Sequence, residues 1–199
     1  MFRLSGSASH NLRRLHSLSG LVPVGVFLLE HFFTNSFALF GAAAFERAAD
    51  RIRHLPFVVV IEVALIGLPI LFHMLAGVLI IATARADTRM RYPRNAQYVA
   101  QRVTGVFLAF FMIFHTWSTR LSPAGRVPGS DLFMIMHRQL ADPLVFWLYV
   151  LGTLSACFHL GNGLFGFAIH WGLARDRSSQ RRAARFGLAT FIVLSLVGV

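Results

Sequence analysis

The amino-acid sequence predicts an all-α integral membrane protein with five transmembrane helices. Of its 199 residues, 56% are hydrophobic and the mean hydropathy is +0.62, which is far too apolar for an ordinary soluble domain. Five apolar stretches are long enough to span a bilayer, for which a helix needs about 20 residues. They leave no room for a separate soluble domain, so residues 1–199 are predicted to form a single transmembrane domain. The predicted helices cover about residues 18–40, 57–84, 103–119, 144–171 and 186–199.

The order of these helices is supported by local signals. The first stretch has a basic leader, but its length and its polar Glu30 and His31 argue against a cleaved signal peptide. The second and fourth stretches begin near Pro56 and Pro143, and proline is favoured in the first turn of a helix. The third and fifth stretches are the shortest, and the fifth ends with the chain.

Two loops have helical patterns of their own. Residues 43–55 place apolar side chains on one side and most charged ones elsewhere, which is typical of a short helix lying on the membrane surface. Residues 131–139 show a similar pattern, with Ser130 or Asp131 as the predicted N-cap. We therefore expect two short surface helices on the outer side.

The distribution of positive charge predicts the orientation. All 19 basic side chains are arginine, and the net charge is +11. Such a charge can indicate nucleic-acid binding, but here the arginines are sorted by loop. Most lie in the N-terminal segment and in the second and fourth loops, and the minority lie in the first and third. By the positive-inside rule, the N-terminus is predicted to be cytoplasmic and the C-terminus to lie outside.

Four of the nine histidines lie well inside four different apolar stretches. Ionisable side chains within a membrane are candidates for function. A hydrogen-bonded packing histidine is the alternative for any one of them, but four, one per helix, are harder to explain by packing. At a rise of 1.5 Å per residue, two lie roughly 8–15 Å from the outer boundary and two roughly 25 Å from it. The sequence therefore predicts an outer pair, His31 and His115, and an inner pair, His73 and His159.

Facing histidines at one depth suit bis-imidazole ligation of haem, with one ring on each face of the macrocycle. The difference in depth disfavours a single metal cluster of all four. The only cysteine is Cys157 and there is no C-x-x-C-H, so any haem would be of the b type, held without covalent attachment. The first four helices are thus predicted to form a bundle around two b haems, with the four histidines as axial ligands of the iron.

Other residues are candidates for contacts with the haems. Gly77 and Gly163 each follow an inner histidine by four residues, so the missing side chain could admit the porphyrin edge. Helix packing is the alternative for both glycines. Four polar residues near the cytoplasmic surface could bind haem propionates, although the arginines among them could instead simply anchor the topology. These residues are Arg14, His16, Ser17 and Arg102.

Two carboxylates are candidates for a proton path. Glu30 precedes His31, and Glu62 lies eleven residues before His73, near the level of the outer pair. A buried carboxylate can carry a proton to or from a quinone. A structural hydrogen bond is an equally good explanation of each.

A weak internal repeat accompanies the histidines. Ser19-Gly20 and Thr104-Gly105 precede the outer histidines at similar spacing, and the pattern FHxxxG occurs at residues 72–77 and 158–163. The members of the outer and inner pairs are separated by 84 and 86 residues. Two helical hairpins of one kind, each contributing two histidines, would produce this pattern.

With these residues in view, the chain resembles the five-helix, dihaem cytochrome b anchor of succinate:menaquinone oxidoreductases, a family that includes fumarate reductases. The similarity covers most of the length. The segments that carry it are RRLHSLSGLVPVGVFLLEH (13–31), LPILFHMLAG (68–77), QRVTGVFL and FHTWSTR (101–120), and LSACFHLGNGL followed by FAIHWG (154–172).

The resemblance implies that the four membrane histidines are the axial haem ligands. It also implies a flavoprotein subunit with FAD and an iron–sulfur subunit on the cytoplasmic face of a bacterial inner membrane. Electrons would run from the iron–sulfur subunit through the inner and outer haems to menaquinone, or in reverse. The dicarboxylate site would lie on a partner subunit, so the chain would act in an enzyme without holding that site.

Two other interpretations remain open from sequence. The first is a dihaem cytochrome b that serves another dehydrogenase, such as a hydrogenase or a formate dehydrogenase. The second is a haem-free transporter or structural bundle whose histidines relay protons or pack. Few polar residues besides Glu30 and Glu62 could line such a path. All three interpretations place the chain in lipid and none involves nucleic acid.

Overall fold

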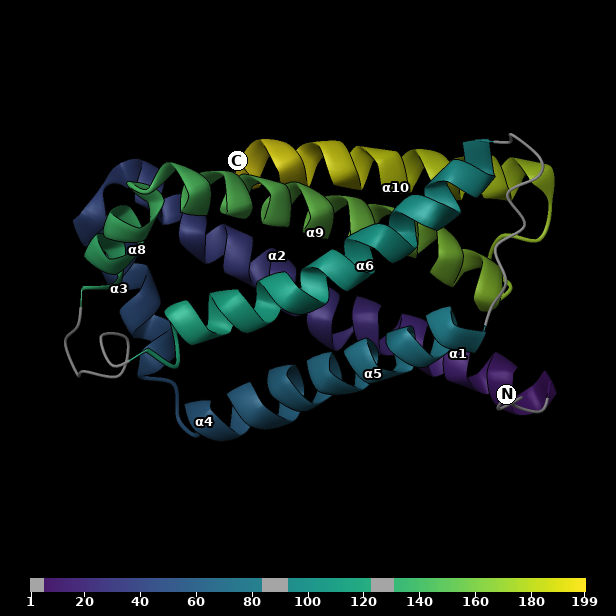
Figure 1. Ribbon diagram of the computed structural model, residues 1–199, viewed down its shortest axis with the longest axis horizontal. Coiled ribbons are helices and arrows are strands. Elements are labelled where there is room, and N and C mark those ends of the chain that lie inside the picture. Colours follow the sequence, from purple (N-terminus) through teal and green to yellow (C-terminus); the bar gives the residue numbers. More distant parts are fainter. Residues whose placement is uncertain (1–5, 84–92, 123–130) are drawn as a thin grey trace.

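The computed structural model describes residues 6–83, 93–122 and 131–199. Within these ranges every regular element is helical, as the composition predicts (Figure 1). The predicted N-cap Ser130 lies outside the described residues. So do four of the loop arginines that were used to predict the orientation: Arg85, Arg89, Arg91 and Arg126.

The elements follow one another with short connections. They are α1 (Gly6–Leu21), α2 (Pro23–Ser36), the 3-10 helix η1 (Phe37–Phe40), α3 (Ala42–Arg53), α4 (Val58–Ile61), the π-helical segment η2 (Glu62–Gly67), α5 (Leu68–Thr83), α6 (Pro93–Ser118), α8 (Leu132–Leu140), α9 (Pro143–His170) and α10 (Arg177–Gly198). The helix predicted for residues 103–119 begins ten residues earlier in the structure, because nearly three more turns, residues 93–102, continue the helix before the apolar stretch.

Four segments of the described chain are long and apolar enough to cross a membrane: Ser7–Phe40, Val58–Thr83, Arg94–Ser118 and Pro143–His170. Many of their apolar side chains point outward, with Phe110 70% and Leu144 80% exposed, as expected for a surface that contacts lipid. α10 is a continuous helix of 22 residues, but its apolar part is shorter than those of the four segments above, because its first turns carry arginines. The fifth span therefore stays a prediction.

Prolines account for the irregular points in the first two spans. Pro23 cannot donate a backbone hydrogen bond, and the first span is divided there into α1 and α2. The wide turns of η2 end at Gly67, two residues before Pro69. Pro143 occupies the first turn of α9 behind the N-cap Asp142, as predicted. The second span, however, begins at Val58 and leaves Pro56 in the preceding turn.

The four spans form a closed ring. α1 packs against α5, α5 against α6, α6 against α9, and α9 back against α1. α10 lies outside this ring along α9, where it makes the most extensive helix–helix contact in the described structure (Figure 1). The two backbones meet at Gly161 and Gly187, since a Cβ on Gly161 would lie 2.5 Å from the carbonyl oxygen of Gly187. Small residues permit such a close approach between membrane helices.

The short helices α3 and α8 lie together at the end of the bundle opposite the N-terminus (Figure 1). Asp131 is the N-cap of α8 and accepts a hydrogen bond from the Met134 N–H at 2.8 Å, as predicted. Glu46 of α3 accepts one from the Phe133 N–H at 2.8 Å. Together α3 and α8 close one end of the ring, and we call them the outer cap after the side on which the sequence predicts them.

Asp176 caps the N-terminus of α10. Its carboxylate accepts hydrogen bonds from the backbone N–H groups of Ser178 and Ser179 at 2.7 and 3.0 Å, and the Ser179 hydroxyl completes a capping box. Hydrogen bonds from the side chain of Ser178 and from Ser179 hold the pKa of Asp176 well below its ordinary value of 3.8.

Asp176→Ala is therefore expected to lower the thermal unfolding temperature in detergent at neutral pH, whereas Asp176→Asn keeps an accepting oxygen and should lose less. Because the folded-state pKa is lowered, the ionised carboxylate stabilises the protein fully above the unfolded-state pKa of about 4. This contribution is lost as the pH falls towards the folded-state value. The gap between wild type and the alanine variant should narrow below about pH 4, and a constant gap would contradict the role of the ionised cap.

Candidate functional site

The outer histidines meet across the ring. His31 on α2 and His115 on α6 have ring centroids 5.7 Å apart, with the rings nearly perpendicular at 84°. Phe111, one turn earlier on α6, stacks on His115. The Tyr149 hydroxyl of α9 lies 3.3 Å from His115 Nδ1. One histidine of this pair comes from each half of the chain.

The inner histidines meet in the same way. His73 on α5 and His159 on α9 have ring centroids 6.1 Å apart and an interplanar angle of 81°. No ring contact joins an inner histidine to an outer one among the described residues. The two levels expected from the depth of the histidines are thus separate places in the bundle.

α1 and α5 hold His73 through a reciprocal contact. His73 Nδ1 donates to the carbonyl oxygen of His16 at 3.0 Å, and His16 Nδ1 donates to the carbonyl oxygen of His73 at 3.1 Å. The two rings stack with centroids 3.9 Å apart. Each ring lies over a glycine of the other helix: a Cβ on Gly77 would lie 3.2 Å from His16 Cε1, and one on Gly20 would overlap the His73 ring. The glycines open each helix so that the opposing ring reaches a backbone carbonyl.

α6 and α9 hold His159 through an equivalent contact in which glutamine replaces His16. Gln101 Nε2 donates to the carbonyl oxygen of His159 at 3.0 Å. A Cβ on Gly105 would lie 3.0 Å from His159 Cε1, and one on Gly163 would lie 3.7 Å from Gln101 Nε2. The Thr104 hydroxyl lies 3.3 Å from His159 Nδ1, as the Ser19 hydroxyl lies 3.3 Å from His73 Nδ1.

The spatial equivalence gives the internal repeat a structural meaning. The small pairs Ser19-Gly20 and Thr104-Gly105 contact the rings of the inner histidines His73 and His159, a role that the sequence analysis did not assign. Tyr149 and Gln101 were also missed. For the small pairs, the signal was present in their similar spacing from the outer histidines. Gln101 lies 85 residues after its counterpart His16, so the repeat contained its signal as well, whereas Tyr149 had none.

The geometry fits a pair of haem sites. Metal–imidazole nitrogen bonds are about 2 Å long, so two rings on opposite faces of a haem have centroids about 6 Å apart. Both observed separations, 5.7 and 6.1 Å, match this value. No group of three or more His, Cys, Asp or Glu side chains that could hold a metal ion converges in the described ranges.

The predicted propionate contacts divide into two groups. Arg14 lies over the Trp171 ring at 4.1 Å, and Trp171 Nε1 donates to the Ser17 hydroxyl at 3.2 Å, which brings these residues together at the end of the inner site. The Arg14 Nε atom is buried without a hydrogen-bond partner. Arg102 instead lies over Tyr98 on its own helix and donates to the Tyr98 hydroxyl.

The two candidate carboxylates have different surroundings. Glu62, at the start of η2, forms a two-point ion pair with Arg120, with Nη2 to Oε2 at 2.9 Å and Nε to Oε1 at 3.3 Å. This pair joins the second and third spans near the outer cap. Glu30 accepts a hydrogen bond from Thr34 at 2.5 Å on the exposed side of α2.

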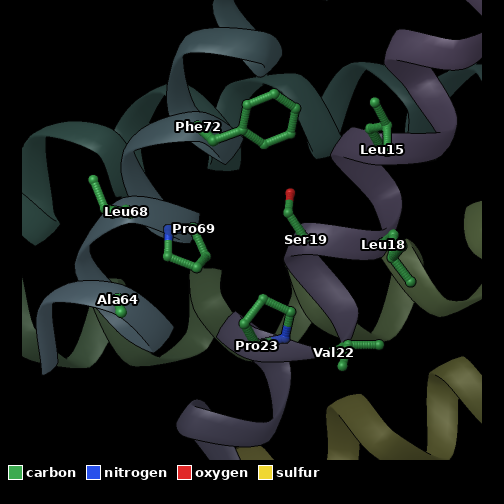
Figure 2. A pocket seen from close by; sticks show the side chains of 9 residues that line it. All are labelled: Leu15, Leu18, Ser19, Val22, Pro23, Ala64, Leu68, Pro69 and Phe72. Carbon is green, nitrogen blue, oxygen red and sulfur yellow. The ribbon is translucent and has the colours of Figure 1, made fainter. Parts of the chain in front are cut away.

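An open apolar groove lies between α1 and the η2–α5 segment, next to the inner site (Figure 2). Its volume is about 450 Å³. Ser19 points into the groove and is the one hydroxyl among its lining side chains (Figure 2). Its proton is donated to the His16 carbonyl at 2.9 Å, so this hydroxyl is not free to donate to a ligand.

Comparison with known proteins decides the family. Residues 83–198 match the family described as the succinate dehydrogenase/fumarate reductase transmembrane subunit. The succinate dehydrogenase cytochrome b558 subunit of Bacillus subtilis (strain 168) is 40% identical over 197 residues, which are 98% of this chain and 96% of the relative. The chain belongs to this family. No solved structure matches it.

For this succinate dehydrogenase/fumarate reductase transmembrane subunit, the two matches differ in extent. The family match includes His115 and His159 but begins after His31 and His73. The alignment with the relative spans nearly the whole chain and so includes the first hairpin as well. All of the histidine contacts described above therefore lie within the region of similarity.

Proposed function

We propose that the chain is the cytochrome b membrane anchor of a succinate dehydrogenase or fumarate reductase and that it binds two b haems. His31 and His115 would ligate the outer haem, and His73 and His159 the inner one. The observation that carries this proposal is the two facing histidine pairs, with centroids 5.7 and 6.1 Å apart at separate levels of one helical ring. The cytochrome name of the B. subtilis relative supports it.

The haems would supply one-electron transfer between the two faces of the membrane. The chain itself holds the ligands: the reciprocal contact of α1 with α5 orients His73, and that of α6 with α9 orients His159. Gly20 and Gly105 leave room for the rings of His73 and His159. Gly77 and Gly163, which the sequence analysis placed beside the porphyrin edge, lie next to the side chains of His16 and Gln101. Arg14, with its unpartnered Nε, has the charge to receive a propionate of the inner haem.

The partners follow from the family. A flavoprotein with FAD and an iron–sulfur subunit would dock on the cytoplasmic side of a bacterial inner membrane, where the N-terminus lies. α10 would form the fifth span and carry the C-terminus to the outside. These assignments agree with Figure 1, in which the N-terminus and the connection between α9 and α10 lie at the end opposite the outer cap.

Menaquinone is the proposed electron acceptor or donor near the outer haem. The Glu62–Arg120 pair lies at this end and joins two spans, so Glu62 can exchange a proton when the ion pair opens. Glu30, which faces away on α2 and bonds Thr34, is the weaker candidate for this role.

The proposal is tested on the complex purified in mild detergent. A pyridine haemochrome assay should give two b haems for each copy of this chain, and a flavoprotein and an iron–sulfur protein should copurify. Two haems with hydrogenase or formate dehydrogenase subunits would favour another dehydrogenase. A folded, colourless chain from haem-replete cells would contradict the electron-transfer role.

A further inference from the structure

The hydroxyl groups beside the histidines indicate which ring nitrogen of each histidine carries the proton. Each hydroxyl has a single proton, and each donates it to an oxygen that can only accept. Such a hydroxyl can take part in a second hydrogen bond only by accepting. The histidine nitrogen opposite must then carry the proton.

Thr104 shows this at the inner site. Its hydroxyl donates to the carbonyl oxygen of Ala100 at 2.8 Å. The hydroxyl oxygen of Thr104 lies 3.3 Å from His159 Nδ1, so it accepts the Nδ1 proton. His159 is therefore the Nδ1–H tautomer, with the Nε2 lone pair free for a metal.

Tyr149 shows the same at the outer site, through a longer chain. Gln139 Nε2 donates to the carbonyl oxygen of Ser118 at 2.8 Å, which fixes the orientation of the amide. The Tyr149 hydroxyl then donates to Gln139 Oε1 at 3.4 Å. Its oxygen is left to accept from His115 Nδ1 at 3.3 Å. Hydrogen bonds through Tyr149 thus connect His115 to Gln139 of α8, and the Nε2 lone pair of His115 is again free for a metal.

Both inner histidines also have a backbone acceptor: the carbonyl oxygen of Gln101 for His159 and that of His16 for His73. His73 Nδ1 lies 3.0 Å from the His16 carbonyl oxygen as well as 3.3 Å from the Ser19 hydroxyl. Since a carbonyl oxygen cannot donate, His73 is also the Nδ1–H tautomer. Removal of the Ser19 hydroxyl alone would leave this nitrogen with an acceptor.

We infer that Tyr149 is a positioning residue that sets the tautomer of His115 and lowers the reduction potential of the outer haem. This inference rests on the proposed function. A histidine that donates from Nδ1 is a more basic ligand at Nε2. A more basic ligand stabilises Fe(III) relative to Fe(II), which lowers the reduction potential. Reduction adds one electron to the iron, and the Nδ1 proton stays on the histidine ring.

The test is a redox titration of the purified complex, followed at the haem α band, for variants matched in size. Tyr149→Phe removes the acceptor at His115 and should raise the midpoint of the outer haem alone. Thr104→Val leaves the Gln101 carbonyl beside His159, and Ser19→Ala leaves the His16 carbonyl beside His73, so neither should shift a midpoint.

The outcomes separate this inference from the proposed function. Two bound haems with an unshifted outer midpoint in Tyr149→Phe would overturn the inference alone. Loss of the outer haem alone from Tyr149→Phe would confirm the hydroxyl as the support of His115. Loss of both haems would overturn that role. A wild-type complex without haem would instead contradict the proposed function.

Discussion

His159→Ala is expected to remove one of the two proposed haems from the purified complex and to leave the other at full occupancy. The lost haem is the inner one, because His159 lies opposite His73 at a centroid distance of 6.1 Å, whereas the His16 ring stacks directly on His73 at 3.9 Å. A haem with one axial imidazole missing is held by a single protein–iron bond in a site built for two. The measurement is haem content per chain by pyridine haemochrome, which should fall from two to one, together with the recovery of the soluble partners.

His10→Ala is the matched control, since His10 is exposed near the N-terminal end of α1. It should retain both haems. His73→Ala should behave as His159→Ala does, and both should weaken assembly because an empty site leaves the ring of helices unfilled. If either variant kept two haems at the wild-type ratio, the pairing of the inner histidines would be wrong.

Gly187→Ala separates α10 from α9. The new Cβ would meet the backbone carbonyl of Gly161, which belongs to the middle of a helix and cannot turn aside. Overpacking of this kind costs about 1–3 kcal/mol. We expect a lower unfolding temperature in detergent and easier proteolysis of α10, measured by calorimetry and limited digestion.

Gly166→Ala on α9 provides the control, because a Cβ at Gly166 has nothing within 4 Å. Alanine is favoured over glycine in a helix by about 1 kcal/mol, so this variant should be neutral or slightly stabilising. Equal unfolding temperatures for the two alanine variants would show that the close contact of the α9 and α10 backbones does not limit stability.

The levels of the histidines could be predicted because they depend only on the axial rise of a helix. Counting residues from the membrane boundary placed His31 with His115 and His73 with His159, and the structure brings these residues together in the same pairs. The all-helical class followed from composition for a similar reason. Apolar stretches of about 20 residues have few alternatives to a spanning helix.

The contacts around each helix axis could not be predicted in this way. His16 was expected at the propionates, yet its ring stacks on His73. Gly77 was expected beside the porphyrin, yet it lies under the His16 ring. Both positions depend on the rotation of α1 relative to α5, and one sequence contains no measure of that rotation. The proton positions on the histidines depend on the hydrogen-bond partners of their Nδ1 atoms, and these partners lie on other helices.

The division of each histidine pair between the two halves of the chain has a consequence for biogenesis. Residues up to Thr83 supply His31 and His73, and residues from Pro93 to His170 supply His115 and His159. Under the proposed ligand set, a nascent chain with only the first hairpin inserted can offer each haem one ligand. Both cofactors must then be captured late, after the fourth span has entered the bilayer. Once bound, each haem would link a helix of the first hairpin to a helix of the second. A shortage of haem would then leave the two hairpins inserted but not joined.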